Sequence, residues 1–271
     1  MPASRDGVES EWKEPFVAKR SPLGEKLDEI KDRIADAAIK AKREPSEVTL
    51  MAVTKTSAPE QIREILTLGV SDLGESRVQI LTQRAGQINE FFQRRLVHGD
   101  GKEMPEKVRW HMIGHLQRNK VKAVLSVVHT IQSIDSLRLA EELDIQCAKL
   151  GKKLPVMLQV NASEEPQKFG IAIGAALHLA EQIDSMPNLQ LTGLMTMGPL
   201  EDDKGKIRQA FSRTRELFEE LKWHKIGGSH LRHLSMGMSH DFEIAIAEGA
   251  TIVRIGTLLF GGKAADNADE D

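Results

Sequence analysis

The chain has 271 residues, a formal net charge of −3 and 40% hydrophobic residues. A charge so close to balance predicts no attraction to nucleic acid or to an anionic membrane surface, and no apolar run is long enough to cross a bilayer. The single cysteine, Cys147, cannot form an internal disulfide, and the N-terminus lacks a signal-peptide pattern, so we expect a cytoplasmic protein.

Along the chain, strand-like apolar runs alternate with helical patterns. Residues 1–20 are polar and without period, and we predict a loose tail there; helical spacing then covers 23–42. We predict eight strands, at 48–54, 70–73, 109–113, 130–133, 154–160, 189–195, a short run ending at 235, and 251–255. The predicted helices lie at 59–68, from after 77 to 92, and at 119–127, 136–150, 175–185, 204–221 and 239–248. A loop is expected at 97–106 and a short polar tail at 263–271.

This alternation indicates the α/β class, because buried strands separated by helices pair in parallel through right-handed crossovers. Eight such units close naturally into a barrel. We therefore predict a single (β/α)8 TIM barrel over 21–262, with an extra N-terminal helix. The alternative is an open doubly wound sheet, although no G-x-G-x-x-G follows the first strand.

Polar residues gather where the predicted strands end, and in a TIM barrel that edge carries the function. Two consecutive strands end in small-residue turns that carry a hydroxyl, at Ser235–Gly237 and Gly256–Thr257. Glycine lets backbone N–H groups approach an anion, and a helix starting at 239 would add its positive end. A phosphate site is one interpretation, and ordinary strand-to-helix turns are the other.

Lys55 and Arg254 are the two basic residues that suggest chemistry. Lys55 follows seven mostly apolar strand residues, so its amine starts at the barrel mouth; partial desolvation would make it a nucleophile toward aldehydes, and a solvated lysine is the alternative. Arg254 lies in a strand and needs an acceptor, either a barrel glutamate or a ligand atom. An amine, a phosphate cradle and a fixed guanidinium match the aldehyde, phosphate and ring nitrogen of pyridoxal 5′-phosphate.

Seven motifs in one order carry a family resemblance. They are AVTKT (52–56), GESRVQ (74–79), WHMIGHLQRNK (110–120), VNASEEPQKFG (160–170), GLMTMGP (193–199), LSMGMSHDFEIAI (234–246) and VRIGTLLFG (253–261). With them the chain resembles the pyridoxal phosphate homeostasis protein family, itself similar to the barrel domain of alanine racemases. Two positions depart from the family pattern: Ser76 stands where asparagine is usual and Ile80 where glutamate is common.

The resemblance implies a fold-type III pyridoxal phosphate site in which Lys55 is the Schiff-base lysine and Arg254 faces the ring nitrogen. The phosphate would be held by Ser235, Gly237, Gly256 and Thr257, with Met236 and Met238 lining that loop and Ser76 and Asn161 in the cofactor-binding set. Lys168 is either a transient second acceptor of the cofactor or a solvated loop lysine paired to Glu164 or Glu165. His111 and His115 lack helical metal-ligand spacing, so we expect no metal site.

The function implied is intracellular vitamin B6 homeostasis without robust turnover. Arginine does not give up its proton, which disfavours a protonated ring, and a racemase would need a second acid/base group. That group is a tyrosine from a C-terminal domain in alanine racemases; this chain contains no tyrosine and runs 16 residues past its last predicted strand. A weak racemase and a cofactor-free Schiff-base aldolase are the alternatives. We expect a monomer or weak dimer, with pyridoxal phosphate-dependent apoenzymes as recipients.

Overall fold

A computed structural model describes residues 20–98, 105 and 107–261, and its strands form a closed barrel. The strands are β1 (Thr49–Val53), β2 (Asp72–Glu75), β3 (Arg109–Met112), β4 (Thr130–Ile134), β5 (Leu154–Asn161), β6 (Ile171–Ala172), β7 (Leu189–Met195), β8 (His233–Ser235) and β9 (Ile252–Ile255). Every pairing is parallel; β1 pairs with β2 and with β9, and β4–β5 and β5–β7 pairs complete the ring. The predicted TIM barrel is confirmed.

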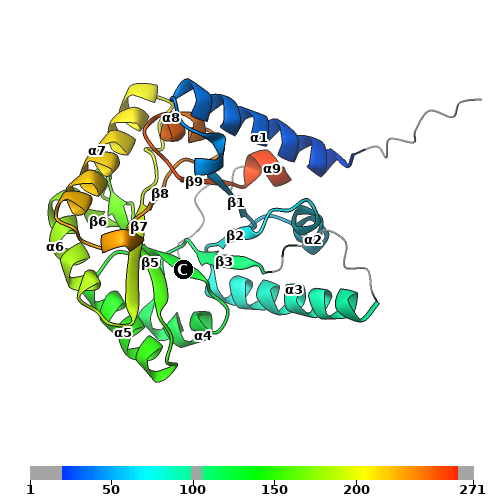
Figure 1. The fold of residues 1–271 in the computed structure, drawn as a ribbon, viewed down its shortest axis with the longest axis horizontal. Coiled ribbons are helices and arrows are strands. Elements are labelled where there is room, and N and C mark those ends of the chain that lie inside the picture. The colour runs from blue at the N-terminus through cyan, green and yellow to red at the C-terminus, as the bar shows by residue number, and fades with distance from the viewer. Residues whose placement is uncertain (1–19, 99–104, 106, 262–271) are drawn as a thin grey trace, which may run out of the picture.

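The helices surround the strands (Figure 1). They are α1 (Pro22–Lys40), α2 (Pro59–Thr67), α3 (Val78–His98), α4 (Val121–Leu125), α5 (Leu137–Lys149), α6 (Ile173–Asp184), α7 (Lys204–Trp223), α8 (Phe242–Ala247) and α9 (Thr257–Phe260), with 3-10 turns at Pro45–Glu47, Arg118–Lys120 and Gly228–His230. The extra N-terminal helix, α1, lies beside α8 and α9. Ser21 caps it by accepting the Gly24 N–H at 3.0 Å, and Leu27 and Ile30 are buried on its inner face.

Two apolar clusters divide the interior. The larger lies between the strands and the helices and takes alternate residues of each strand, such as Leu73, Ile131 and Val253. Because successive strand side chains face opposite sides, the residues between them point into the barrel. One part of that inner face is apolar, with a separate cluster of Met51, Met157, Met195 and Ile252. Other inward residues are polar, and they include Arg254.

Several element boundaries differ from the prediction. Strand β2 begins at Asp72 and includes Gly74 and Glu75, because pairing with β1 and β3 overrides their low strand propensity. Helix α3 runs into the predicted 97–106 loop. The short elements β6 and α9 were not predicted, since two to four residues carry no periodicity.

Helix α8 starts at Phe242, three residues later than predicted. Gly237 has a φ of 92°, and the Met238 N–H donates to Asp241 Oδ1 at 2.5 Å, so the chain makes a turn before the helix begins. Residues 1–19 and 262–271, which hold most of the predicted N-terminal tail and all of the C-terminal one, lie outside the described residues. Within the part that is described, no helix is both long and apolar enough to span a membrane.

Candidate functional site

The closed barrel brings the turns after β1 and β9 together. Ala52 of β1 pairs with Ile255 of β9, so the turn holding Lys55 follows directly beside Gly256. A Cβ added at Gly256 would lie 3.3 Å from the carbonyl oxygen of Val53, which shows how closely the two strand ends approach. Lys55 and the Gly256–Thr257 turn are therefore neighbours at the carboxyl end of the barrel.

Lys55 is exposed, whereas we predicted partial desolvation. The prediction failed because the chain leaves the barrel one residue after β1, at Thr54, and carries Lys55 into a solvent-facing turn. Among the described residues no carboxylate forms an ion pair with its amine. The amine is thus accessible to a ligand.

A buried ion pair supports the turn that holds Lys55. Glu75 is 1% exposed; its Oε2 accepts from Arg84 Nη1 at 2.5 Å and from the Thr54 hydroxyl at 3.0 Å. Arg84 also donates to the carbonyl oxygens of Thr54 and Ser57, and so ties α3 to both ends of the turn. The sequence reasoning missed Arg84. A buried glutamate signals a cation nearby but does not say which one.

The two glycine turns are hydrogen-bonded to each other. The Leu258 N–H donates to the hydroxyl of Ser239 at 3.3 Å, which links the turn after β9 to the turn after β8. Gly237 has a positive φ, and a Cβ there would lie 2.5 Å from the Cβ of Ala245, so only glycine fits without strain. The structure therefore brings together the two segments from which a phosphate site was predicted.

Arg254 is buried on β9 and its charge has no carboxylate in contact within the described residues. Nη1 donates to the carbonyl and hydroxyl oxygens of Ser235 at 2.7 and 2.9 Å, and Nη2 donates to the Thr196 carbonyl at 2.8 Å. Burial lowers the pKa of Arg254 to about 10, against a smaller opposing effect of Asp241, so the guanidinium stays cationic at neutral pH. Its Nε–H has no acceptor among the described residues.

Two of the residues predicted to surround the phosphate, Ser235 and Met236, direct their side chains away from the glycine turns. The Ser235 hydroxyl faces the barrel interior, where it donates to Gln132 Oε1 at 2.7 Å. Met236 is fully buried in the larger apolar cluster, so its side chain does not line the loop as predicted. The error came from reading the two methionines as a pair, although both follow the end of β8 and Gly237 between them has a positive φ that turns the chain. Met238 and Thr257 are partly exposed.

The remaining predicted residues surround the loop after β5. Asn161 Nδ2 donates to the carbonyl of Glu165 at 2.9 Å and so holds that loop folded. The Lys168 ammonium lies 2.6 Å from Glu165 Oε2 and donates to the Gly198 carbonyl at 2.7 Å. The predicted alternative of a solvated lysine paired to Glu164 or Glu165 is therefore right about the partner, Glu165. It is wrong about solvation, because the Lys168 side chain is only 9% exposed. Lys168 joins the loops after β5 and β7.

Ser76 and the histidines occupy separate places. Ser76 is partly buried, and a Cβ at Gly114 would lie 2.3 Å from its carbonyl oxygen, so the loops after β2 and β3 are in contact. His115 stacks on Phe169 with ring centroids 4.4 Å apart, whereas His111 is inside the barrel. Across the described ranges, no three histidine, cysteine or acidic side chains are grouped as metal ligands would be.

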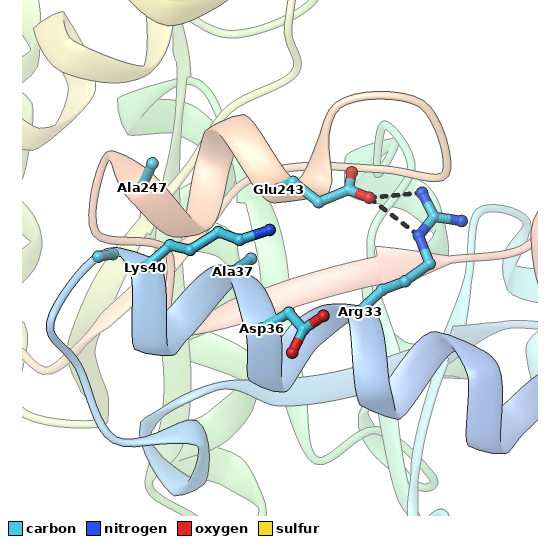
Figure 2. A pocket seen from close by; sticks show the side chains of 7 residues that line it. Arg33, Asp36, Ala37, Lys40, Glu243 and Ala247 are labelled. Carbon is cyan, nitrogen blue, oxygen red and sulfur yellow. Dashed lines mark hydrogen bonds and ion pairs between the residues drawn. The ribbon is translucent and has the colours of Figure 1, made fainter.

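Two cavities border α1, away from the carboxyl ends of the strands. One, of about 430 Å³, lies between α1 and α8, where Arg33 and Glu243 point toward each other with Nη2 and Oε1 2.5 Å apart (Figure 2). The other, also about 430 Å³, lies near the start of β1 and β2 and is bordered by Asp72. Neither of these two cavities includes Lys55 or Arg254.

Comparison with known proteins agrees with this geometry. The family model of the alanine racemase N-terminal domain matches residues 26–264. The pyridoxal phosphate homeostasis protein of Aquifex aeolicus is 38% identical over 237 residues, which cover 88% of this chain and 96% of that protein. The pyridoxal phosphate homeostasis protein of Pasteurella multocida is 37% identical over 241 residues, covering 89% and 97%.

Solved structures show the same fold. PipY of Synechococcus elongatus with pyridoxal phosphate bound has a TM-score of 0.70 and 30% identity over 88% of this chain and all of that one. An alanine racemase of Clostridium difficile, 14% identical with a TM-score of 0.65, covers 90% of this chain and 57% of that one and shares the fold. The extent of these matches shows that the chain belongs to the pyridoxal phosphate homeostasis protein family, on the barrel of the alanine racemase N-terminal domain.

Proposed function

We propose that this protein binds pyridoxal 5′-phosphate as a Schiff base on Lys55 and takes part in intracellular vitamin B6 homeostasis without robust catalytic turnover. Relatives at 37–38% identity carry the homeostasis name, and a structural neighbour at 30% identity has pyridoxal phosphate bound. Apoenzymes that depend on the cofactor are the proposed recipients, in the cytoplasm.

The residues at the barrel mouth fit the cofactor's groups. Lys55 offers an exposed amine for the aldehyde, and the bonded turns at Gly237 and Gly256 offer backbone for the phosphate. Arg254 carries the proposal: it is a buried cation with no contacting carboxylate in the described structure, and its Nε–H is without an acceptor there. A ring nitrogen is an acceptor that this donor would satisfy.

The same arginine argues for holding the cofactor rather than turning over substrates. Pyridoxal phosphate supplies an aldehyde for a lysine and an electron sink whose strength depends on ring protonation. Arg254 remains protonated at neutral pH and donates, so it disfavours a proton on the ring nitrogen. The sequence contains no tyrosine to act as the second acid/base group of a racemase. A weak racemase would exchange the α-proton of an amino acid in deuterated water, whereas a carrier should show almost no exchange.

Ser235 and Lys168 receive narrower roles than the resemblance implied. We propose that Ser235 contributes its backbone at the phosphate turn, because its hydroxyl is already engaged inside the barrel. Lys168 would have to leave both Glu165 and the Gly198 carbonyl before it could accept the cofactor. We therefore propose that it mainly holds two mouth loops together.

The test is the visible absorbance of the purified protein before and after borohydride reduction, followed by peptide mass mapping. We expect a yellow protein whose reduced adduct maps to Lys55, and a Lys55→Ala variant that loses the colour. Lys168→Ala is the matched control and should keep the adduct on Lys55. A wild-type protein that stays colourless after incubation with pyridoxal phosphate would refute the proposal, and an adduct on Lys168 alone would move the site.

A further inference from the structure

A continuous file of buried polar side chains crosses the barrel interior from Arg254 to Asp72. Arg254 Nη1 donates to Ser235 Oγ at 2.9 Å, and Ser235 Oγ lies 2.7 Å from Gln132 Oε1. Gln132 Nε2 lies 3.1 Å from His111 Nδ1, and His111 Nε2 lies 3.0 Å from Asp72 Oδ1. All five residues are less than 8% exposed, and each lies on the inward face of a different strand or at its end.

The direction of every hydrogen bond in this file is fixed by its two ends. Arginine can only donate, so Ser235 Oγ accepts from it and gives its own proton to Gln132 Oε1. The amide then presents its Nε2–H to His111 Nδ1, which must be the unprotonated ring nitrogen. His111 Nε2–H donates to Asp72 in turn.

Asp72 is an ionised acceptor at the far end. Burial would raise the pKa of Asp72, but hydrogen bonds from His111 and Arg109 hold it well below its usual range. A flipped Gln132 amide would aim Nε2 at Ser235 Oγ and leave the Ser235 O–H without an acceptor among the described residues. It would also require a proton on His111 Nδ1, so one arrangement satisfies every group.

We propose that Gln132 and His111 are positioning residues that, through Ser235, hold the Arg254 guanidinium in the orientation that receives a ligand's ring nitrogen. This inference rests on the proposed function. Gln132 contacts the mouth turn at the Ser235 hydroxyl, and His111 acts only through Gln132. Without Gln132 the Ser235 hydroxyl has no inward acceptor, and one of the two Nη1 contacts that orient Arg254 is no longer fixed.

The first experiment compares two ligands in one variant. Gln132→Met removes both polar atoms of the amide at nearly constant volume. We expect it to weaken pyridoxal phosphate binding roughly tenfold, measured by absorbance titration. A carbocyclic analogue with C–H in place of the ring nitrogen should bind wild type and variant within about twofold of each other, since Arg254 has no nitrogen to meet in it.

Gln159→Met is the matched control. Gln159 is another buried glutamine on an inward face, but it donates to the Phe169 carbonyl at 3.1 Å and stands outside the file. The Gln159→Met variant should leave the ratio of the affinities for pyridoxal phosphate and for the carbocyclic analogue unchanged. Equal weakening of both ligands in Gln132→Met, or the same change of ratio in Gln159→Met, would overturn the inference. A wild type that binds neither ligand would instead refute the proposed function, and this inference with it.

A second measurement uses the wild-type protein without cofactor, so it does not depend on whether a variant folds. Nitrogen-15 NMR of the histidine-labelled wild-type protein at neutral pH should show His111 as the neutral tautomer with the proton on Nε2. A proton on Nδ1, alone or together with Nε2, would reverse the Gln132 amide and overturn the inference.

Discussion

Two arginines lie near the barrel mouth, Arg84 partly buried on α3 and Arg254 buried on β9, and their partners differ. Arg84 meets the carboxylate of Glu75 at 2.5 Å and also binds the carbonyls of Thr54 and Ser57. Arg254 binds two carbonyls and a hydroxyl; the carboxylate it reaches through hydrogen bonds, Asp72, is at the far end of a file. Arg84 is neutralised where it stands and stabilises the fold, whereas Arg254 keeps an uncompensated charge that a ligand can use.

The largest effect should come from removing Arg84. Arg84→Met leaves Glu75 buried and unpaired, which we expect to lower the free energy of unfolding by about 3–5 kcal/mol and the Tm by roughly 10 °C. Arg254→Met leaves only carbonyls and a hydroxyl without a donor and should cost about 1–3 kcal/mol. Thermal and urea unfolding of the cofactor-free proteins measure both.

The double variant Glu75→Leu/Arg84→Met is the control for the larger effect, because it removes both charges and should recover much of the loss. If Arg254→Met proves as destabilising as Arg84→Met, the contrast between a structural and a ligand-directed arginine is wrong.

An intermediate effect is expected at Gly237, in the turn after β8. This turn adjoins Arg254, because the backbone N–H of Arg254 donates to the Gly237 carbonyl at 2.9 Å. Gly237→Ala places a Cβ 2.5 Å from that of Ala245 at a φ of 92°, and should cost about 2–3 kcal/mol. Gly256→Ala, at a φ of −119° with its nearest contact at 3.3 Å, should cost about 1 kcal/mol or less. Urea unfolding compares them, and equal costs would contradict the assigned strain.

A pH-dependent effect, smaller than that of Gly237→Ala, concerns Asp72, the carboxylate at the other end of the file from Arg254. Because the pKa of Asp72 is lowered on folding from 3.8, its ionised form stabilises the protein above pH 3.8, and that stability is lost as the pH falls through the lowered value. Asp72→Asn should therefore cost about 2 kcal/mol at pH 7 and progressively less below pH 4. Urea unfolding across this range checks the sign; a difference that grows in acid would contradict it.

The sequence by itself determined the barrel and the identity of its mouth residues. Apolar strand runs alternating with helical spacing are local signals, and eight of them leave few ways to close a sheet. Lys55, Arg254 and the two glycine turns were found because each directly follows or ends such a run. Boundaries were less certain where neighbours decide them, as at β2, whose Gly74 and Glu75 join the sheet only by pairing with β1 and β3.

Only the tertiary structure decided what each buried polar group binds. Arg84 reaches Glu75 because α3 packs against β2, and no spacing in the sequence distinguishes it from the other arginines of that helix. Ser235 meets Gln132, 103 residues away, only after the ring of strands has closed. Hydrogen bonds require distances near 3 Å, and residues far apart in the sequence reach those distances only once the barrel is closed. The alternation of apolar strands and helices that predicts the barrel is a local pattern, so it can be read from the sequence.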